Sequence, residues 1–155
     1  MSKFKSLIDA YGVSHQNKTN KLIHWICVPA IFFSLVGLIS LIPFPWEISL
    51  FSSVKLNWAF VALVLVLCSY LSLSIAISIG MTLFSFCCIY LCSELSGSEH
   101  PLWMYIGIFA ASWVLQFIGH HIEGKKPSFL QDIQFLLIGP AWLMHFIYEK
   151  LNIPY

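Results

Sequence analysis

Four of the six histidines in this 155-residue sequence lie close to the ends of two long stretches without a charged residue, 22–46 and 100–122. With the acidic residue that follows the second stretch, they form a set of candidate metal ligands: His15, His24, His120, His121 and Glu123. On a helix, His120 and Glu123 share a face because they are three residues apart, whereas His121 is rotated by about 100°. A histidine and a glutamate at this spacing are a recurrent source of metal ligands inside helix bundles. The residue types and their spacing therefore indicate a metal site.

The segments that must position these side chains are apolar. Hydrophobic residues make up 59% of the sequence and charged residues 10%, whereas soluble domains carry about a quarter charged residues. A helix needs about 20 apolar residues to cross the hydrocarbon core of a bilayer. The sequence thus predicts an all-α protein, a polytopic integral membrane helix bundle that forms one domain over residues 1–155 in the lipid bilayer. Its formal net charge of +1 gives no sign of a nucleic-acid partner.

Four spans and a shorter C-terminal helix are expected. As a single helix, the uncharged stretch 56–93 would be roughly 57 Å long, nearly twice the bilayer core, so it is expected to fold back near residues 68–74. The expected segments are an N-terminal amphipathic segment at 1–20, spans at 22–42, 56–71, 74–93 and 102–121, and a C-terminal helix at 128–150. Thr19 or Asn20 is expected to cap the first span. The last helix is expected to break near Gly139 and Pro140.

The lysines, which are the only basic residues apart from histidine, predict the orientation in the membrane. Lys55 alone lies in the loop 43–57, whereas the other lysines near the spans precede the first or follow the fourth: Lys3, Lys5, Lys18, Lys21, Lys125 and Lys126. Cytoplasmic loops carry an excess of positive charge, so the N-terminus is expected in the cytoplasm. The four candidate histidines then share the cytoplasmic side of a bacterial inner membrane or an endoplasmic reticulum, and His100 falls on the opposite side.

Other roles are open to the same side chains. A single histidine at a membrane edge often bonds a phosphate or a backbone carbonyl. Glu123 is as well explained by solvation or by a weak surface pair with Lys125 as by metal ligation. Lys125 and Lys126 are most simply topological anchors, with binding of a substrate carboxylate as the second interpretation. Four histidines on one side of the molecule favour a metal site over four separate roles.

Both ends of the chain carry motifs. The N-terminal block is Tyr11-x3-His15-x4-Asn20-x3-His24, and the C-terminal block is QFIGHHIEGKKPSF followed by FLLIGPAWL. With these blocks the sequence resembles the membrane-bound, iron-dependent 2-hydroxy fatty acid dioxygenases of yeast and many bacteria. The resemblance implies that His15, His24 and His120 are catalytic and hold Fe²⁺, with His121 and Glu123 as further candidates. It also implies oxidative decarboxylation of a 2-hydroxy fatty acid by O₂ to the fatty acid one carbon shorter.

This chemistry suits the residues on independent grounds. Imidazole suits ferrous iron, and non-haem iron oxygenases keep open positions for substrate and O₂. A 2-hydroxy acid can chelate iron through its carboxylate and hydroxyl, and one O₂ accepts the four electrons that the reaction releases. Neither 2-oxoglutarate nor a flavin is then required. Aromatic side chains that can line an acyl slot, or simply pack in the core, are Trp25, Phe32, Phe33, Trp113 and Phe117.

Two other classes of protein remain open from the sequence, and a third is excluded. A membrane protein that binds haem between His24 and His120 is the first alternative, but it leaves His15 and His121 unexplained. A non-enzymatic membrane protein is the second. A di-iron desaturase or hydroxylase is excluded because it needs more histidines, in HxxxH and HxxHH boxes that do not occur here.

Overall fold

The computed structural model describes residues 3–50, 54–124 and 129–154, and most of these residues are helical. In chain order the helices are α1 (Lys3–Gly12), α2 (Lys18–Ser40), α3 (Trp58–Leu71), α4 (Ile75–Leu95), α5 (Pro101–Glu123) and α6 (Phe129–Leu151). The described residues contain no strand, only one isolated bridge between Ser49 and Lys55. The predicted all-α class is therefore confirmed.

Three helices, α2, α4 and α5, are long and apolar enough to cross a membrane. The expected span at 56–71 is shorter in the structure, because Asn57 caps α3 by accepting a hydrogen bond from the backbone N–H of Ala59. With 14 residues, α3 is about 21 Å long, less than the hydrocarbon thickness of about 30 Å. The structure thus supplies three candidate spans and one shorter apolar helix, and a fourth crossing stays a prediction.

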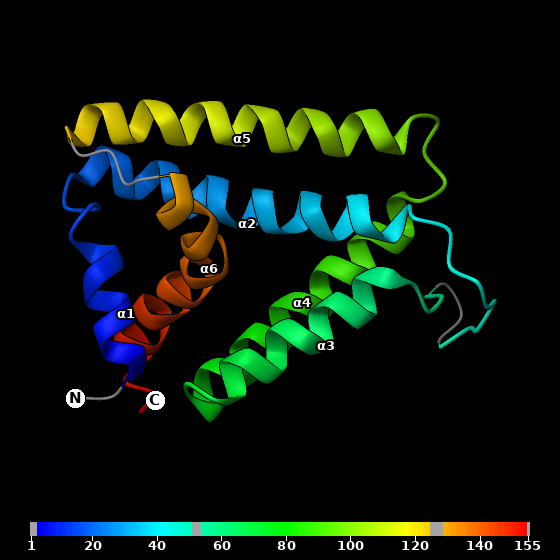
Figure 1. Cartoon of the computed structure of the whole chain (residues 1–155), viewed down its shortest axis with the longest axis horizontal. Helices are drawn as coiled ribbons and strands as arrows, with labels where there is room; N and C mark the ends of the chain where they lie inside the picture. Colours follow the sequence, from blue (N-terminus) through cyan, green and yellow to red (C-terminus); the bar gives the residue numbers. More distant parts are fainter. Residues whose placement is uncertain (1–2, 51–53, 125–128, 155) are drawn as a thin grey trace.

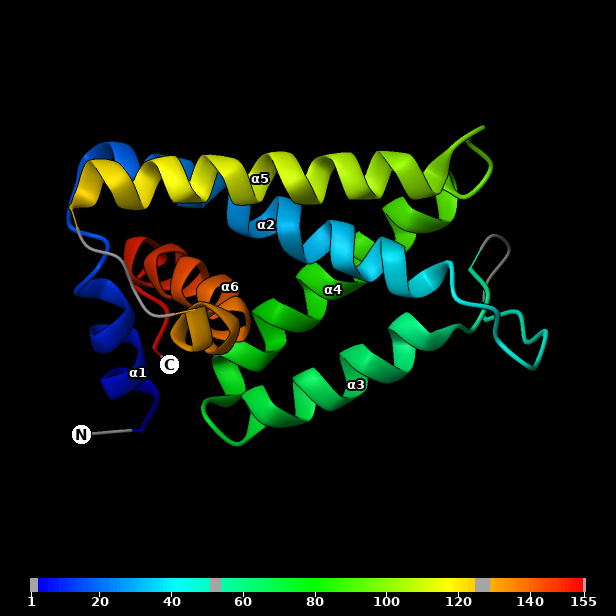
Figure 2. The same ribbon diagram turned by 45° about the horizontal axis from the view of Figure 1, so that its top comes forward.

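The helices pack in three pairs, α2 with α5, α3 with α4 and α1 with α6, and α2 contacts helices of both other pairs. Helices α2 and α5 run side by side in opposite directions, while α3 and α4 form a hairpin that crosses below them (Figures 1 and 2). The hairpin turns at residues 72–74, inside the segment where the sequence placed it, and Ser74 caps α4. Helices α1 and α6 lie at the end of the molecule where α2 begins and α5 ends (Figure 1).

Glycines let α2 and α5 approach closely at both ends of their contact. At one end, a Cβ added to Gly37 would lie 2.3 Å from the ring of Tyr105. At the other end, a Cβ added to Gly119 would lie 2.4 Å from Oδ1 of Asn20. Membrane helices associate mainly through such close packing of small residues, because lipid provides no hydrophobic driving force between them.

Helix α6 is continuous through Pro140, so the predicted break near Gly139 and Pro140 is wrong. Proline removes one backbone hydrogen bond, but two tyrosine hydrogen bonds, one of them made by Tyr148 of α6 itself, tie the helix to its neighbours α3 and α4. Tyr70 donates a hydrogen bond to the carbonyl of Leu137, and Tyr148 donates to that of Ala76. Gly139 does not interrupt the helix; it marks a close approach, where an added Cβ would lie 3.2 Å from Val28 and 3.3 Å from the Tyr11 hydroxyl.

Replacing Gly37 with alanine is expected to lower the melting temperature of the detergent-solubilised protein, because Tyr105 is buried and fills the space that the methyl group needs. Overpacking of this kind typically costs about 1–3 kcal/mol. Gly107→Ala in α5 is the matched control, since nothing lies within 4 Å of the added Cβ. Both variants gain the same helix propensity, so the difference between their melting temperatures reports the clash with Tyr105 alone. Equal melting temperatures would contradict the close approach of α2 and α5 at Gly37.

Candidate metal centre

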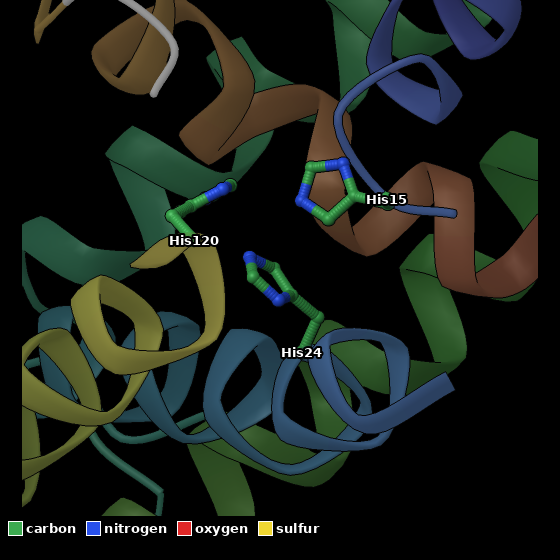
Figure 3. A group of neighbouring side chains, drawn as sticks. All are labelled: His15, His24 and His120. Atoms are coloured by element: carbon green, nitrogen blue, oxygen red, sulfur yellow. The ribbon is translucent and has the colours of Figure 1, made fainter. Parts of the chain in front are cut away.

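Three histidines from three segments meet at the end of the molecule where α2 begins. His24 lies in the second turn of α2, His120 in the last turn of α5, and His15 in the loop between α1 and α2 (Figure 3). The ring centroids are 4.3 Å apart for His15 and His24, 4.9 Å for His24 and His120, and 5.1 Å for His15 and His120. One nitrogen of each ring lies within 4.8 Å of those of the other two. Within the described ranges no other three metal-binding side chains are this close.

In His15 and His24, a hydrogen bond to a backbone carbonyl determines which ring nitrogen is available to bind a metal. Nδ1 of His15 lies 2.7 Å from the carbonyl of Tyr11, and Nδ1 of His24 lies 2.9 Å from that of Asn20. Each Nδ1 must carry the proton that it donates, which leaves Nε2 with a free lone pair. Histidines that bind a metal through one ring nitrogen typically donate the N–H of the other to a carbonyl or carboxylate, as the Nδ1–H groups do here.

The free nitrogens are buried and need a partner. Nε2 of His15 and Nδ1 of His120 have no hydrogen-bond partner within the described part of the chain. Burial lowers the pKa of His15 to about 4, so its ring is neutral at pH 7. A group of imidazoles in which two buried nitrogens are unpaired fits a divalent transition metal such as Fe²⁺ or Zn²⁺, because a bound ion would satisfy these buried polar atoms.

Aromatic side chains hold the ring of His15, which no helix carries. The ring of Tyr11 stacks on His15 at 4.1 Å with an angle of 8° between the planes. Trp142 from α6 contacts both rings, with centroids 5.0 Å from Tyr11 and 5.3 Å from His15, and is itself buried. The loop histidine is thus fixed from one side by α1 and from another by α6.

Glu123, the last residue of α5, binds the start of α2. One carboxylate oxygen accepts from the backbone N–H of Gln16, and the other accepts from the N–H of Asn17, each at 2.8 Å. The second oxygen also accepts from the side-chain amide of Asn20 at 3.1 Å. Asn17, and not Thr19 or Asn20 as the sequence predicted, caps α2, because its own side chain accepts from two N–H groups of the first turn. The carboxylate therefore sits where the helix dipole favours a negative charge.

A cavity of about 30 Å³ adjoins the three histidines. Its lining consists of Tyr11, His15, His24, Val28, Ile31, Trp113, Gln116, His120 and Leu136. By volume it holds about two water-sized groups beside the rings. The space suits an ion with small ligands, and it does not favour the alternative of a haem, whose porphyrin is far larger.

The other predicted site residues lie elsewhere. The structure does not bring His121 or Glu123 into the three-histidine group: His121 is exposed, and Glu123 binds the loop before α2. His100 is at the opposite end, where α5 begins. Lys125 and Lys126 are outside the described residues. Of the five aromatic residues predicted as walls, Trp113 alone contributes to the cavity.

Sequence reasoning missed Trp142 and the roles of Tyr11 and Asn20. Tyr11 and Asn20 belong to the N-terminal motif, and Trp142 belongs to the segment FLLIGPAWL, but motif membership does not reveal their contacts. No spacing rule links Trp142 to His15, because they belong to segments far apart in the chain. Only the packing of α6 against the loop shows the connection.

The fold and the site together define a class: an α-helical bundle with three helices long and apolar enough to cross a membrane, and a buried group of three histidines at one end. Comparison with known proteins is more specific. Residues 1–151 match the family described as 2-hydroxy-palmitic acid dioxygenase Mpo1-like, and the chain belongs to that family. It is 26% identical over 150 residues, 96% of this chain and 81% of the relative, to the 2-hydroxy-palmitic acid dioxygenase MPO1 of Saccharomyces cerevisiae. No solved structure matches the chain.

Replacing Glu123 with glutamine is expected to weaken metal binding. An amide offers one oxygen acceptor where the carboxylate offers two, so the loop that carries His15 loses part of its attachment. The expected loss of affinity is about 10-fold, the low end of what removal of an orienting group typically causes. Titration of the metal-free protein with Co²⁺ as a probe ion measures it. Glu94→Gln, an exposed change at the far end of α4, should leave the affinity unaltered. Unchanged affinity in Glu123→Gln would contradict this role.

Proposed function

We propose that this protein is an Fe²⁺-dependent dioxygenase that converts 2-hydroxy fatty acids to fatty acids one carbon shorter. The observation that carries the proposal is the buried group of His15, His24 and His120, with free ring nitrogens facing a small cavity. Membership of a family described by 2-hydroxy-palmitic acid dioxygenase activity supports the choice of substrate class.

The three histidines would hold the ion and leave part of its surroundings open to the cavity. Iron, when bound, would supply a centre at which O₂ and the two oxygens of a 2-hydroxy acid can meet. The reaction R–CHOH–COOH + O₂ → R–COOH + CO₂ + H₂O balances in atoms. The acid loses four electrons and O₂ accepts four, so no reductant or second cosubstrate is required.

The protein's own residues have three tasks in this proposal. His15 and His24 present Nε2 because their Nδ1 protons are bonded to backbone carbonyls. The buried surroundings keep bulk water away from the reacting atoms, which strengthens electrostatic interactions inside the site. The exposed apolar surfaces of the membrane-crossing helices let the acyl chain remain in hydrocarbon.

We also propose that the histidine end faces the cytoplasm. Lys18 and Lys21 lie at that end of α2, whereas Lys55 lies beyond its other end. This asymmetry agrees with the excess of positive charge that cytoplasmic loops carry. The substrate would then be taken from the cytoplasmic half of the bilayer.

Single replacements of the three histidines are expected to remove both iron and activity. In His24→Ala or His120→Ala only two protein ligands would remain, and turnover should fall at least about 100-fold, or roughly 3 kcal/mol of transition-state stabilisation. His100→Ala and His121→Ala are the matched controls, one at the far end and one exposed beside the site, and both should retain iron and activity. Metal analysis and product formation are measured on the same preparations. Iron retained at wild-type level in His24→Ala or His120→Ala would contradict the ligand set.

The purified protein with Fe²⁺, O₂ and 2-hydroxypalmitic acid is expected to turn over repeatedly without any addition. The ratio of O₂ consumed to fifteen-carbon acid formed should be near one, as the electron balance requires. Palmitic acid lacks one chelating oxygen and should remain unchanged. An oxygen electrode combined with mass spectrometry of the products provides both measurements. A requirement for 2-oxoglutarate or a reductase would show that the proposed reaction is wrong.

A further inference from the structure

Helix α5 presents more than a histidine to the cavity. Trp113, Gln116 and His120 all line it, and their spacing of three and four residues places them on one face of the helix. Much of the remaining cavity lining is apolar and has no hydrogen-bonding group: Val28 and Ile31 of α2 and Leu136 of α6. Besides the histidines, two polar side chains of the lining come from α5, Trp113 and Gln116, and one comes from α1, Tyr11.

The indole N–H of Trp113 is buried and has no hydrogen-bond partner among the residues that the structure describes. A buried tryptophan N–H usually has a partner, because leaving a donor unpaired costs free energy. The ring itself is held by aromatic neighbours on the same helix, with centroids 6.1 Å from Phe109 and 5.6 Å from Phe117. An unpaired donor thus belongs to a side chain that is fixed beside the site.

The chemistry of this donor limits what can satisfy it. An indole N–H is a donor only, so it cannot be a metal ligand, and a cation cannot be its partner. It needs an acceptor, and a negatively charged acceptor gives the stronger hydrogen bond. A 2-hydroxy acid that chelates an ion through its hydroxyl and one carboxylate oxygen keeps its second carboxylate oxygen free to accept.

We propose that Trp113 is a substrate-binding residue whose indole N–H donates to the carboxylate of the 2-hydroxy acid at the three-histidine centre. This inference rests on the proposed function. The cavity of about 30 Å³ then receives the carboxylate of the substrate, and the contact from α5 fixes the direction in which the carboxylate lies. Trp113 would distinguish an acid from an apolar lipid, because only the acid offers an acceptor.

Trp113→Phe is the sharpest test, because it keeps an aromatic ring and removes the N–H. Binding of 2-hydroxypalmitic acid to the Fe²⁺-loaded protein is measured without O₂, and Fe²⁺ affinity is measured separately. The dissociation constant for the acid should rise about 10-fold or more, as expected for a hydrogen bond to a charged group, while Fe²⁺ affinity stays the same. Under turnover, KM should rise more than kcat falls. Trp103→Phe, the same change at a position of α5 that is 69% exposed, should alter neither dissociation constant.

Each other outcome would overturn the inference. Unchanged affinity for the acid in Trp113→Phe would show that the N–H makes no contact with it. Loss of Fe²⁺ affinity in that variant would assign Trp113 to the packing of the histidines. An equal effect of Trp103→Phe would remove the link to the cavity. Failure of the proposed function is separate from these results, because it would appear in the unmodified Fe²⁺-loaded protein as absence of product from 2-hydroxypalmitic acid.

Discussion

The junction between the start of α2 and the end of α5 is the constraint on which the site depends. Three N–H donors from residues 16, 17 and 20 converge on the carboxylate of Glu123, and the absence of a side chain at Gly119 lets Asn20 pack against α5. These polar contacts are specific in direction, whereas the apolar packing along the rest of α2 and α5 is not. They set the register of the two helices, and the register places His120 opposite His24.

The same junction explains how a loop residue becomes part of a rigid site. His15 has no helix to fix its direction, yet it is buried as completely as His24. Its ring is held by a hydrogen bond to the backbone carbonyl of Tyr11, by stacking on the Tyr11 ring and by contact with Trp142. Glu123 holds the backbone on the other side of the loop. Helices α1 and α6 are therefore parts of the site, although neither contributes a candidate ligand.

The sequence predicted those features of the structure that depend mainly on one physical effect. Hydrophobicity and length predicted the helical class and the fold-back of 56–93, and the motif spacing predicted the family. It predicted less well those features for which two interactions compete. Asn17 caps α2 although Thr19 and Asn20 are equally plausible caps, since the Asn20 side chain donates to Ser14 and Glu123 instead. Pro140 remains inside a helix because tertiary contacts outweigh its local cost. Contacts such as that between Trp142 and His15 join distant segments, and no local pattern reports them.

The bonds of Glu123 span 103 to 107 positions of the chain, and this separation bears on how the protein is made. During synthesis His15 and His24 emerge early, while most of the polypeptide that must return to them is still untranslated. Two imidazoles alone bind a metal ion weakly. The three-histidine group forms only when α5 packs against α2. Binding of the proposed ion would therefore be coupled to completed folding.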